Sequence, residues 1–255
     1  MTSSPSYRRS ESLAAFPHGY FGRRGGRSTG NFASLNVSEA SGDDLTLVAQ
    51  NRAQATKAIG FLPDALATIR QTHSTIVHAI TAPPLPGSRP EGDAMVANVP
   101  GIVLGILTAD CAPVLLADPH AGVIGAFHAG WKGAIGGIAR DTVLAMAELG
   151  ADPARIVATI GPTISLPNYE VGPDFAANLL AQHPDATNRI TIGTSGREHF
   201  DLPGFVADQL RGAGIGSVEN LEICTYAAPE TYFSHRYATH KGTTTGRQIA
   251  LIGLP

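Results

Sequence analysis

The chain has 255 residues, of which 43% are hydrophobic and 15% are charged, and its formal net charge is −3. A chain of this length and apolar content can bury a sizeable core, and its small negative charge excludes a general attraction to nucleic acid or anionic membranes. No stretch approaches the roughly 20 consecutive apolar residues that span a bilayer. The first 15 residues lack the apolar segment of a secretory signal, and the only cysteines are Cys111 and Cys224. We therefore expect a reduced, cytoplasmic protein.

The N-terminal third predicts few regular elements. Residues 1–15 are expected to form a disordered tail, and residues 18–30 a loop rich in glycine and arginine. Asp43 or Asp44 can cap a helix that continues through Ala58. Residues 67–80 alternate weakly between apolar and polar, which predicts a strand, a turn near His73 and a second strand.

The middle of the chain contains three short apolar runs, which predict buried strands over residues 102–108, 114–117 and 123–127. Asp110, Cys111 and His128 follow where these runs stop, and sites are often built at strand ends. The apolar spacing after them predicts one helix over residues 134–149, which Gly150 ends.

The last third predicts a strand over residues 155–160, helices over 173–182 and 203–212, and a strand over 218–225 that contains Cys224. Strands and helices alternate irregularly, without the rhythm of a barrel or a Rossmann sheet. We therefore predict an α/β protein of mixed α+β type, with mixed β-sheets flanked by helices.

Several kinds of site are excluded by their absent motifs. The chain has no Gly-x-Gly-x-x-Gly, no phosphate-binding loop and no Gly-x-Ser-x-Gly. It also lacks the His-x-Glu and Pro-Cys-x-x-Cys of zinc deaminases and the His-x-His pairs typical of multicopper oxidases. Two interpretations remain: one metal ion held by Cys111, His128 and a further histidine, or a Cys111–His128 nucleophile pair. His73 is the natural third ligand, although its spacing alone does not single it out.

A set of short motifs resembles the YfiH-type laccase-domain family, also called polyphenol oxidase and purine nucleoside phosphorylase. The resemblance extends in order from His18 to Gln248. The matching segments are 23–26, 34–36, 51–52, 71–73, 92–94, 108–114, 128–133, 160–162, 169–171, 224–225, 233–236 and 246–248.

The resemblance implies one catalytic domain over residues 16–255, with a metal ion, usually Zn²⁺ and alternatively Cu²⁺, held by His73, Cys111 and His128. It implies phosphorolysis of adenosine, inosine, guanosine and 5′-methylthioadenosine, together with deamination of adenosine. Purine nucleosides and phosphate are then the partners, without nucleic acid or membrane. Either a monomer or a homodimer remains open.

Further site residues are expected around these ligands. The catalytic set comprises Cys111, His128, and Asp93 and Asp110, which can orient a ligating histidine or carry protons. The expected substrate-binding residues are Arg23, Asn36, Arg52, Lys132, Arg236 and Arg247, whose basic members can hold phosphate.

The chain departs from the family pattern at three positions: Thr163 replaces a frequent cysteine, His235 a tyrosine, and Lys132 an arginine. Three other functions stay open: a copper-dependent phenol oxidase, a cysteine hydrolase built on Cys111 and His128, and a non-enzymatic protein that zinc stabilises.

Overall fold

The computed structural model describes residues 4–85 and 87–255. One of its two large sheets has five strands in the order β1-β2-β13-β6-β3. These strands are β1 (Tyr7–Arg8), β2 (His18–Phe21), β13 (Gln248–Gly253), β6 (Val103–Thr108) and β3 (Leu66–Ala67). The pairings are antiparallel except between β3 and β6, which are parallel. Strands that are distant in sequence are therefore neighbours in this sheet.

The other large sheet has six strands in the order β12-β9-β7-β8-β5-β4. They are β12 (Ser217–Asn220), β9 (Val157–Ile160), β7 (Ala112–Asp118), β8 (Val123–Ala129), β5 (Ala94–Ala97) and β4 (Val77–Ala79). Its outer pairs, β12 with β9 and β4 with β5, are parallel, and its central pairs are antiparallel. A separate antiparallel pair consists of β10 (Ile190–Ile192) and β11 (Glu198–Phe200).

The two large sheets pack face to face. Along β7, Leu115 and Ala117 enter the core between the sheets, whereas Val114 and Leu116 point to the opposite face. In β13, Ala250 and Ile252 face the same inter-sheet core. Successive side chains of a strand point to opposite faces of the sheet. Because both faces of each sheet are covered, apolar residues occupy both sets of positions.

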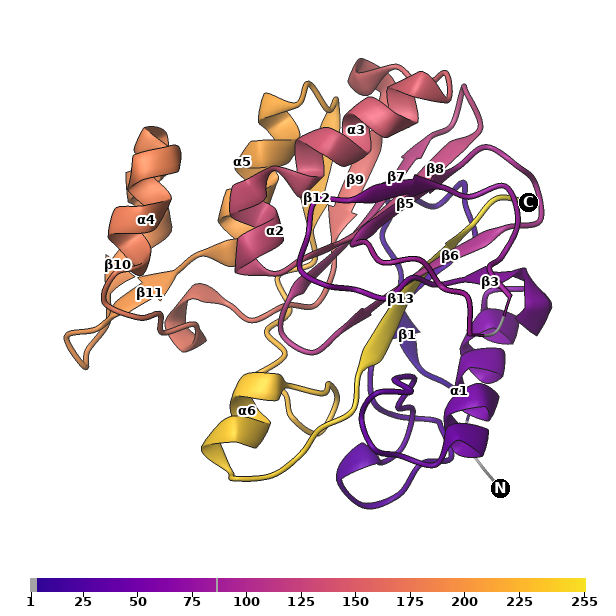
Figure 1. Ribbon diagram of the computed structural model, residues 1–255, viewed down its shortest axis with the longest axis horizontal. Coiled ribbons are helices and arrows are strands. Elements are labelled where there is room, and N and C mark those ends of the chain that lie inside the picture. Colours follow the sequence, from indigo (N-terminus) through magenta and orange to yellow (C-terminus); the bar gives the residue numbers. More distant parts are fainter. Residues whose placement is uncertain (1–3, 86) are drawn as a thin grey trace.

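Helices cover the outer faces of the sheets (Figure 1). The helices are α1 (Leu45–Ala58), α2 (Trp131–Gly136), α3 (Ile138–Glu148), α4 (Phe175–Gln182), α5 (Leu202–Gly212) and α6 (His235–His240). Apolar residues of α2, α3 and α5 share one core with β7 and β8, and those of α1 share another with β6 and β13. The order of layers is therefore helices, six-stranded sheet, five-stranded sheet and α1, which confirms the predicted mixed α/β fold.

The predicted disordered tail does not hold for residues 4–15, and residues 1–3 lie outside the described part of the chain. Tyr7 and Arg8 pair with β2, and Leu13 is fully buried between the two sheets. Ser10 Oγ hydrogen-bonds Glu219 Oε2 (2.5 Å) and Thr159 Oγ1 (2.7 Å). A few apolar and hydroxyl anchors hold a segment whose composition is otherwise polar.

Two other predicted elements differ in the structure. The helix expected over residues 134–149 is divided into α2 and α3 at Gly137, whose φ of 97° lies in the left-handed region. The strand expected over residues 218–225 ends at Asn220, and Cys224 joins Thr163 only through an isolated bridge. Within the described residues, no helix combines the length and apolar character required to cross a membrane.

Candidate active site

The candidate site lies where the chain passes from one large sheet to the other. The turn 109–111 joins β6 to β7, and Asp110 in this turn has a φ of 91°. Cys111 lies directly before β7, while His128 is inside β8 opposite Pro113. His73 comes from the loop between β3 and β4 and has a φ of 60°. Three separate segments thus meet at one end of the sheets.

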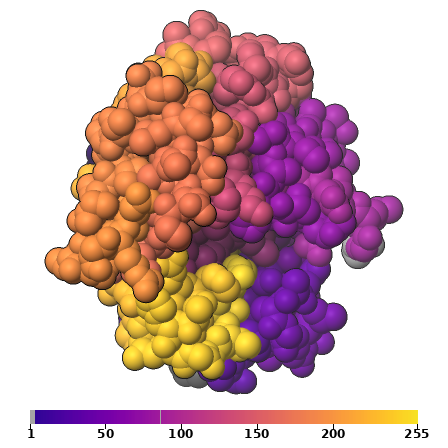
Figure 2. Space-filling view, turned by 60° about the vertical axis from the view of Figure 1, so that its left-hand side comes forward, coloured from indigo at the N-terminus to yellow at the C-terminus, as the bar shows by residue number. Residues whose placement is uncertain are grey.

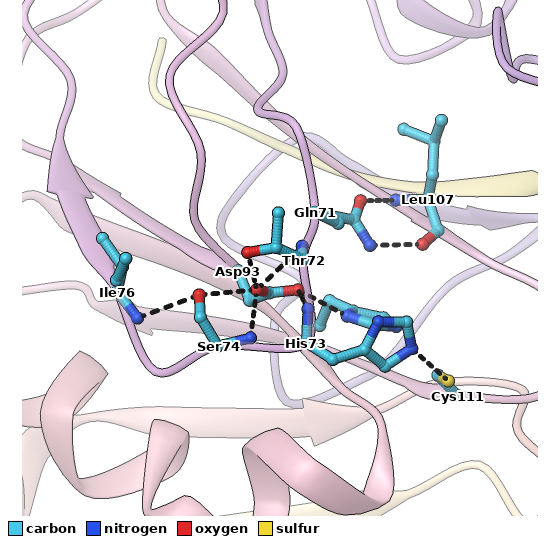
Figure 3. A network of polar contacts seen from close by, with 9 residues as sticks. Gln71, Thr72, His73, Ser74, Ile76, Asp93, Leu107 and Cys111 are labelled. Carbon is cyan, nitrogen blue, oxygen red and sulfur yellow. Dashed lines mark hydrogen bonds and ion pairs between the residues drawn. The ribbon is translucent and has the colours of Figure 1, made fainter.

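The carboxylate of Asp93, fully buried directly before β5, organises this meeting point (Figure 3). Its Oδ1 accepts hydrogen bonds from Nδ1 of His128 (2.8 Å) and from the backbone N–H of His73 (3.0 Å). Its Oδ2 accepts from the backbone N–H groups of Thr72 (3.1 Å) and Ser74 (2.6 Å) and from the Ser74 hydroxyl (2.7 Å). One carboxylate therefore fixes the His128 ring and shapes the turn that carries His73.

Burial alone raises the pKa of Asp93, but the hydrogen bonds from His128 and Ser74 outweigh it and hold that pKa well below its usual range. Asp93 is therefore ionised at neutral pH and remains an acceptor. Because it engages Nδ1 of His128, only Nε2 of that ring is left for another partner.

The ligand atoms of His73, Cys111 and His128 all lie within 4.8 Å of one another. Cys111 Sγ is 3.9 Å from Nε2 of His73, and the two imidazole rings meet edge to face at 82°. Two imidazole nitrogens and one thiolate suit zinc, which in catalytic sites takes three protein ligands and leaves a fourth position open. Copper also binds such ligands. His73, the predicted third ligand, therefore lies beside the other two candidate ligands.

Cys111 and His128 each favour the charged form of the other, the thiolate and the imidazolium. Burial raises the pKa of the Cys111 thiol, but the positive charge of His128 opposes it and lowers that pKa to about 6. Burial likewise opposes protonation of His128, yet the Cys111 thiolate and Asp93 raise its pKa to about 9. A metal ion that binds here displaces the proton shared by this pair. The same Cys111–His128–Asp93 arrangement also resembles the triad of a cysteine hydrolase.

The cluster opens into a cavity of about 780 Å³, within the usual range for small-molecule sites. Figure 2 shows the surface hollowed where the yellow C-terminal segment meets the indigo and purple N-terminal third. Ile69, Leu107 and Ala109 supply apolar lining. The basic lining residues are Arg52, Arg70, Arg89 and Arg247. The cavity thus combines the His73–Cys111–His128 cluster, an apolar surface and several cationic side chains.

The structure brings two of the predicted anion-binding residues, Arg52 and Arg247, into this cavity. Arg247 donates from Nη1 to the carbonyl of Gly246 (3.0 Å) and forms no ion pair with any described residue. Burial lowers the pKa of Arg247, while the charges of Cys111 and Asp110 oppose that effect. Asn36, a predicted substrate contact, is fully buried and accepts from the backbone N–H of Arg247 (2.9 Å). It therefore positions Arg247 and is not itself among the described lining residues.

Three other predicted anion binders are not among the described residues that line the cavity. Arg23 donates from Nε to the Ala33 carbonyl and from Nη1 to the Pro229 carbonyl, each at 2.8 Å, and so ties two loops together. Arg236 donates from Nη2 to the Glu170 carbonyl (2.9 Å). Lys132 is exposed, and its ammonium lies 5.5 Å from the centre of the Trp131 ring.

Asp110 holds the turn rather than a histidine. Its Oδ1 accepts from the Thr225 hydroxyl and its Oδ2 from the backbone N–H of Arg236, both at 2.6 Å. The Thr163 hydroxyl donates to the Asp110 carbonyl (2.6 Å). Of the two predicted aspartates, only Asp93 therefore orients a histidine of the cluster.

Other lining residues were missed by the sequence analysis. Gln71 holds the His73 loop against β6 through two hydrogen bonds, one donated to the Leu107 carbonyl (2.7 Å) and one accepted from its N–H (2.8 Å). Thr243, Thr244 and Thr245 also line the cavity. The run of three threonines just before Arg247 is the sequence signal that could have identified this part of the cavity lining.

Comparisons with known proteins show the family of the chain. The family model described as "Multi-copper polyphenol oxidoreductase laccase" matches residues 17–255. A protein of Deinococcus radiodurans named purine nucleoside phosphorylase is 45% identical over 242 residues, which are 94% of this chain and 90% of the relative. One of the same name from Corynebacterium glutamicum is 39% identical over 234 residues, 91% of this chain and 92% of the relative.

Two solved structures have the same fold over nearly their whole length. The hypothetical protein YfiH of Bacillus licheniformis superposes with a TM-score of 0.89 at 28% identity, covering 100% of this chain and 98% of the other. YlmD from Geobacillus stearothermophilus superposes with a TM-score of 0.89 at 29% identity, covering 100% and 97%.

Proposed function

The chain belongs to the multi-copper polyphenol oxidoreductase laccase family, and on that basis we propose that it is a metal-dependent purine nucleoside phosphorylase that also deaminates adenosine. The proposed substrates are phosphate and the nucleosides adenosine, inosine, guanosine and 5′-methylthioadenosine. The names of its relatives support the phosphorylase activity. Cys111 and Cys224 are free thiols, in keeping with the cytoplasm as the proposed location.

One observation carries this proposal: the His73–Cys111–His128 cluster shares a cavity with Arg247, a guanidinium that forms no ion pair with the described residues. The three donor atoms fit zinc, and a zinc ion bound there supplies Lewis-acid chemistry. Phosphorolysis needs this kind of assistance for the departing purine, and it needs an anion site for the attacking phosphate. Both lie in one cavity.

The chain's own residues then have distinct roles. Arg247 holds phosphate through its planar guanidinium, with Asn36 positioning its backbone. Ile69, Leu107 and Ala109 offer an apolar surface to the purine and exclude water from it. Asp93 keeps the proton of His128 on Nδ1, so that the Nε2 atom of that ring stays directed to the cluster. In this proposal Asp93 is a positioning residue.

The decisive experiment incubates the purified protein with inosine, with and without phosphate, and separates the products by chromatography. We expect hypoxanthine and ribose 1-phosphate only when phosphate is present. His73→Ala and Cys111→Ala should each lower the rate about 100-fold or more, because loss of a ligand exceeds the 10- to 100-fold effect of losing an outer-shell partner. His120→Ala is the matched control, since His120 is exposed and is not among the described lining residues.

Other outcomes discriminate the alternatives. Hypoxanthine release without phosphate, unaffected by His73→Ala, identifies a cysteine hydrolase instead. Oxidation of a phenol by protein that retains copper after purification supports the oxidase named in the family description. Full phosphorolytic activity of Cys111→Ala contradicts the proposed metal centre.

A further inference from the structure

A carboxylate of the protein itself joins two of the arginines that line the cavity. Glu39, in the loop before α1, accepts from Nη1 of Arg52 through Oε1 (2.7 Å). Its Oε2 accepts from Nη2 of Arg89, which lies in the proline-rich loop 81–92. All three residues line the same cavity as the His73–Cys111–His128 cluster. A ligand that fills this cavity therefore meets the Glu39 bridge as well as the cluster.

The bridge differs from an ordinary surface ion pair. The Arg52 side chain is only 14% exposed, and its Nε is fixed by a 2.7 Å hydrogen bond to the Val37 carbonyl. Two guanidinium groups that converge inside a cavity repel each other unless an anion lies between them. A group with one oxygen on each guanidinium is the arrangement that carboxylates and phosphates both adopt with arginine. Glu39 thus occupies a ready-made anion position.

The cavity accordingly contains two kinds of cationic position. Arg247 forms no ion pair with the described residues and is left for a ligand anion, whereas the Arg52–Arg89 pair is already bridged by the Glu39 carboxylate. Arg70 is paired with Glu91. A substrate that carries a second anionic group must displace Glu39 or lie against its charge, and a neutral substrate need do neither.

We propose that Glu39 is a specificity-determining residue that restricts the cavity to nucleosides and rejects their 5′-monophosphates. It acts by occupying the Arg52–Arg89 position that a substrate phosphate would otherwise bind. This proposal rests on the proposed function, because the nucleoside is the substrate inferred there. Its test nevertheless needs no turnover, since the rejection is a difference in binding.

The experiment measures the affinities of inosine and inosine 5′-monophosphate by calorimetry, using the zinc-loaded protein at low ionic strength. The wild-type protein should bind inosine at least tenfold more tightly than the monophosphate. Glu39→Gln keeps the side-chain length and removes the charge, so it should tighten binding of the monophosphate about tenfold or more. Its affinity for inosine should change less than twofold.

A second substitution ties the gain to the arginine pair. In the double variant Glu39→Gln/Arg89→Met the tighter binding of the monophosphate should be lost, because one of the two guanidiniums is gone. Asp141→Asn is the matched control: Asp141 pairs with Arg140 on α3, neither is among the described lining residues, and its loss should leave both affinities unchanged.

The proposal is overturned if the wild-type protein binds the monophosphate as tightly as inosine, or if Glu39→Gln leaves their ratio unchanged. It is also overturned if the double variant keeps the gain. If the protein binds inosine but shows no phosphorolysis, the proposed function is contradicted. The comparison of the two affinities still tests the role of Glu39 in that case.

Discussion

At the scale of single residues, the missing Cβ atom of Gly130 leaves room for the His73 ring beside Cys111. A Cβ atom at Gly130 would lie 2.5 Å from Cδ2 of His73 and 3.2 Å from Sγ of Cys111. The first distance is far inside van der Waals contact, so the His73 ring would have to move. The φ of Gly130 is −75°, which any residue adopts. The requirement for glycine is therefore purely steric.

We predict that Gly130→Ala weakens zinc binding about 10- to 100-fold, the range found when the surroundings of a metal ligand are disturbed. Competition with a chromogenic chelator measures this affinity. Gly172→Ala is the control, because no atom lies within 4 Å of a Cβ at that position. Equal zinc affinity in the Gly130→Ala protein and the control would show that His73 has room to move.

Cys111 and His128 were candidates because they follow predicted strands, and His73 entered through the family resemblance. The different roles of the two aspartates could not be predicted. Asp93 and Asp110 carry the same carboxylate chemistry, so the sequence does not distinguish their roles. Only the fold reveals that Asp93 faces His128 across neighbouring strands, while the left-handed backbone at Asp110 turns its carboxylate toward Thr225. Arg23 and Arg236 were overestimated for a similar reason, since arginine ties loops together as readily as it binds phosphate.

At the scale of elements, the N-terminal segment is secured by the fully buried histidine that begins β2. His18 Nε2 accepts from the backbone N–H of Ser10, and its Nδ1 donates to the Phe16 carbonyl, both at 2.8 Å. Burial lowers the pKa of His18, although the hydrogen bond to Phe16 opposes this. The ring is therefore neutral when folded, and a proton on Nε2 would remove the acceptor that Ser10 requires.

We predict that the stabilisation provided by the hydrogen bonds of His18 is lost at acidic pH. Because the pKa of His18 is lower in the folded than in the unfolded protein, the unfolded chain binds more protons, and stability is lost as pH falls below 6.5. At pH 8, His18→Ala should lower the free energy of unfolding by about 1–3 kcal/mol, because the buried Ser10 N–H and Phe16 carbonyl lose their hydrogen-bond partner. The difference between the two proteins should shrink from pH 8 to 5.5.

Denaturant titrations of the wild-type protein and of His18→Ala across this pH range provide the measurement. Arg9 and Glu219 are the nearby charged groups. Burial opposes ionisation of Glu219, but hydrogen bonds from Ser10 and Ser12 lower its pKa, so it stays ionised across this pH range. A difference that stays constant down to pH 5.5 would contradict the role given to a neutral His18.

Hydrophobic patterning predicted elements that face a core, among them β6, β7, β8 and α5. The helix α1 was predicted from a capping aspartate, which the structure identifies as Asp44. Patterning failed where a local backbone conformation interrupts a continuing pattern. Ile135, Ile138 and Thr142 keep helical spacing across Gly137, so the break between α2 and α3 is invisible to periodicity. The N-terminal segment was misjudged because isolated residues such as Leu13 anchor it without a repeating pattern.

At the scale of the whole molecule, the three proposed metal ligands come from segments that are otherwise separate. His73 lies in a loop, Cys111 at the passage between the two sheets, and His128 in a central strand. A ligand that binds only the folded arrangement stabilises it by mass action.

We therefore predict that zinc at 100 times its dissociation constant raises the free energy of unfolding by about 2.7 kcal/mol. For a chain of this size that corresponds to a rise of roughly 5 to 10 °C in the melting temperature. Calorimetric melting with zinc, and again after removal of zinc with a chelator, measures the shift. His73→Ala should abolish most of it and His120→Ala should preserve it. An equal shift in the His73→Ala protein would place the bound zinc elsewhere.

The position of β13 has a consequence for how the protein is made. This strand lies between β2 and β6 in the five-stranded sheet, although both of those strands precede it by well over a hundred residues. During translation β2 and β6 therefore leave the ribosome with unpaired edges and wait for the strand that separates them. Exposed edges of this kind invite pairing with other nascent chains. Because Arg247 directly precedes β13, this cavity-lining arginine also takes its place only when β13 joins the sheet.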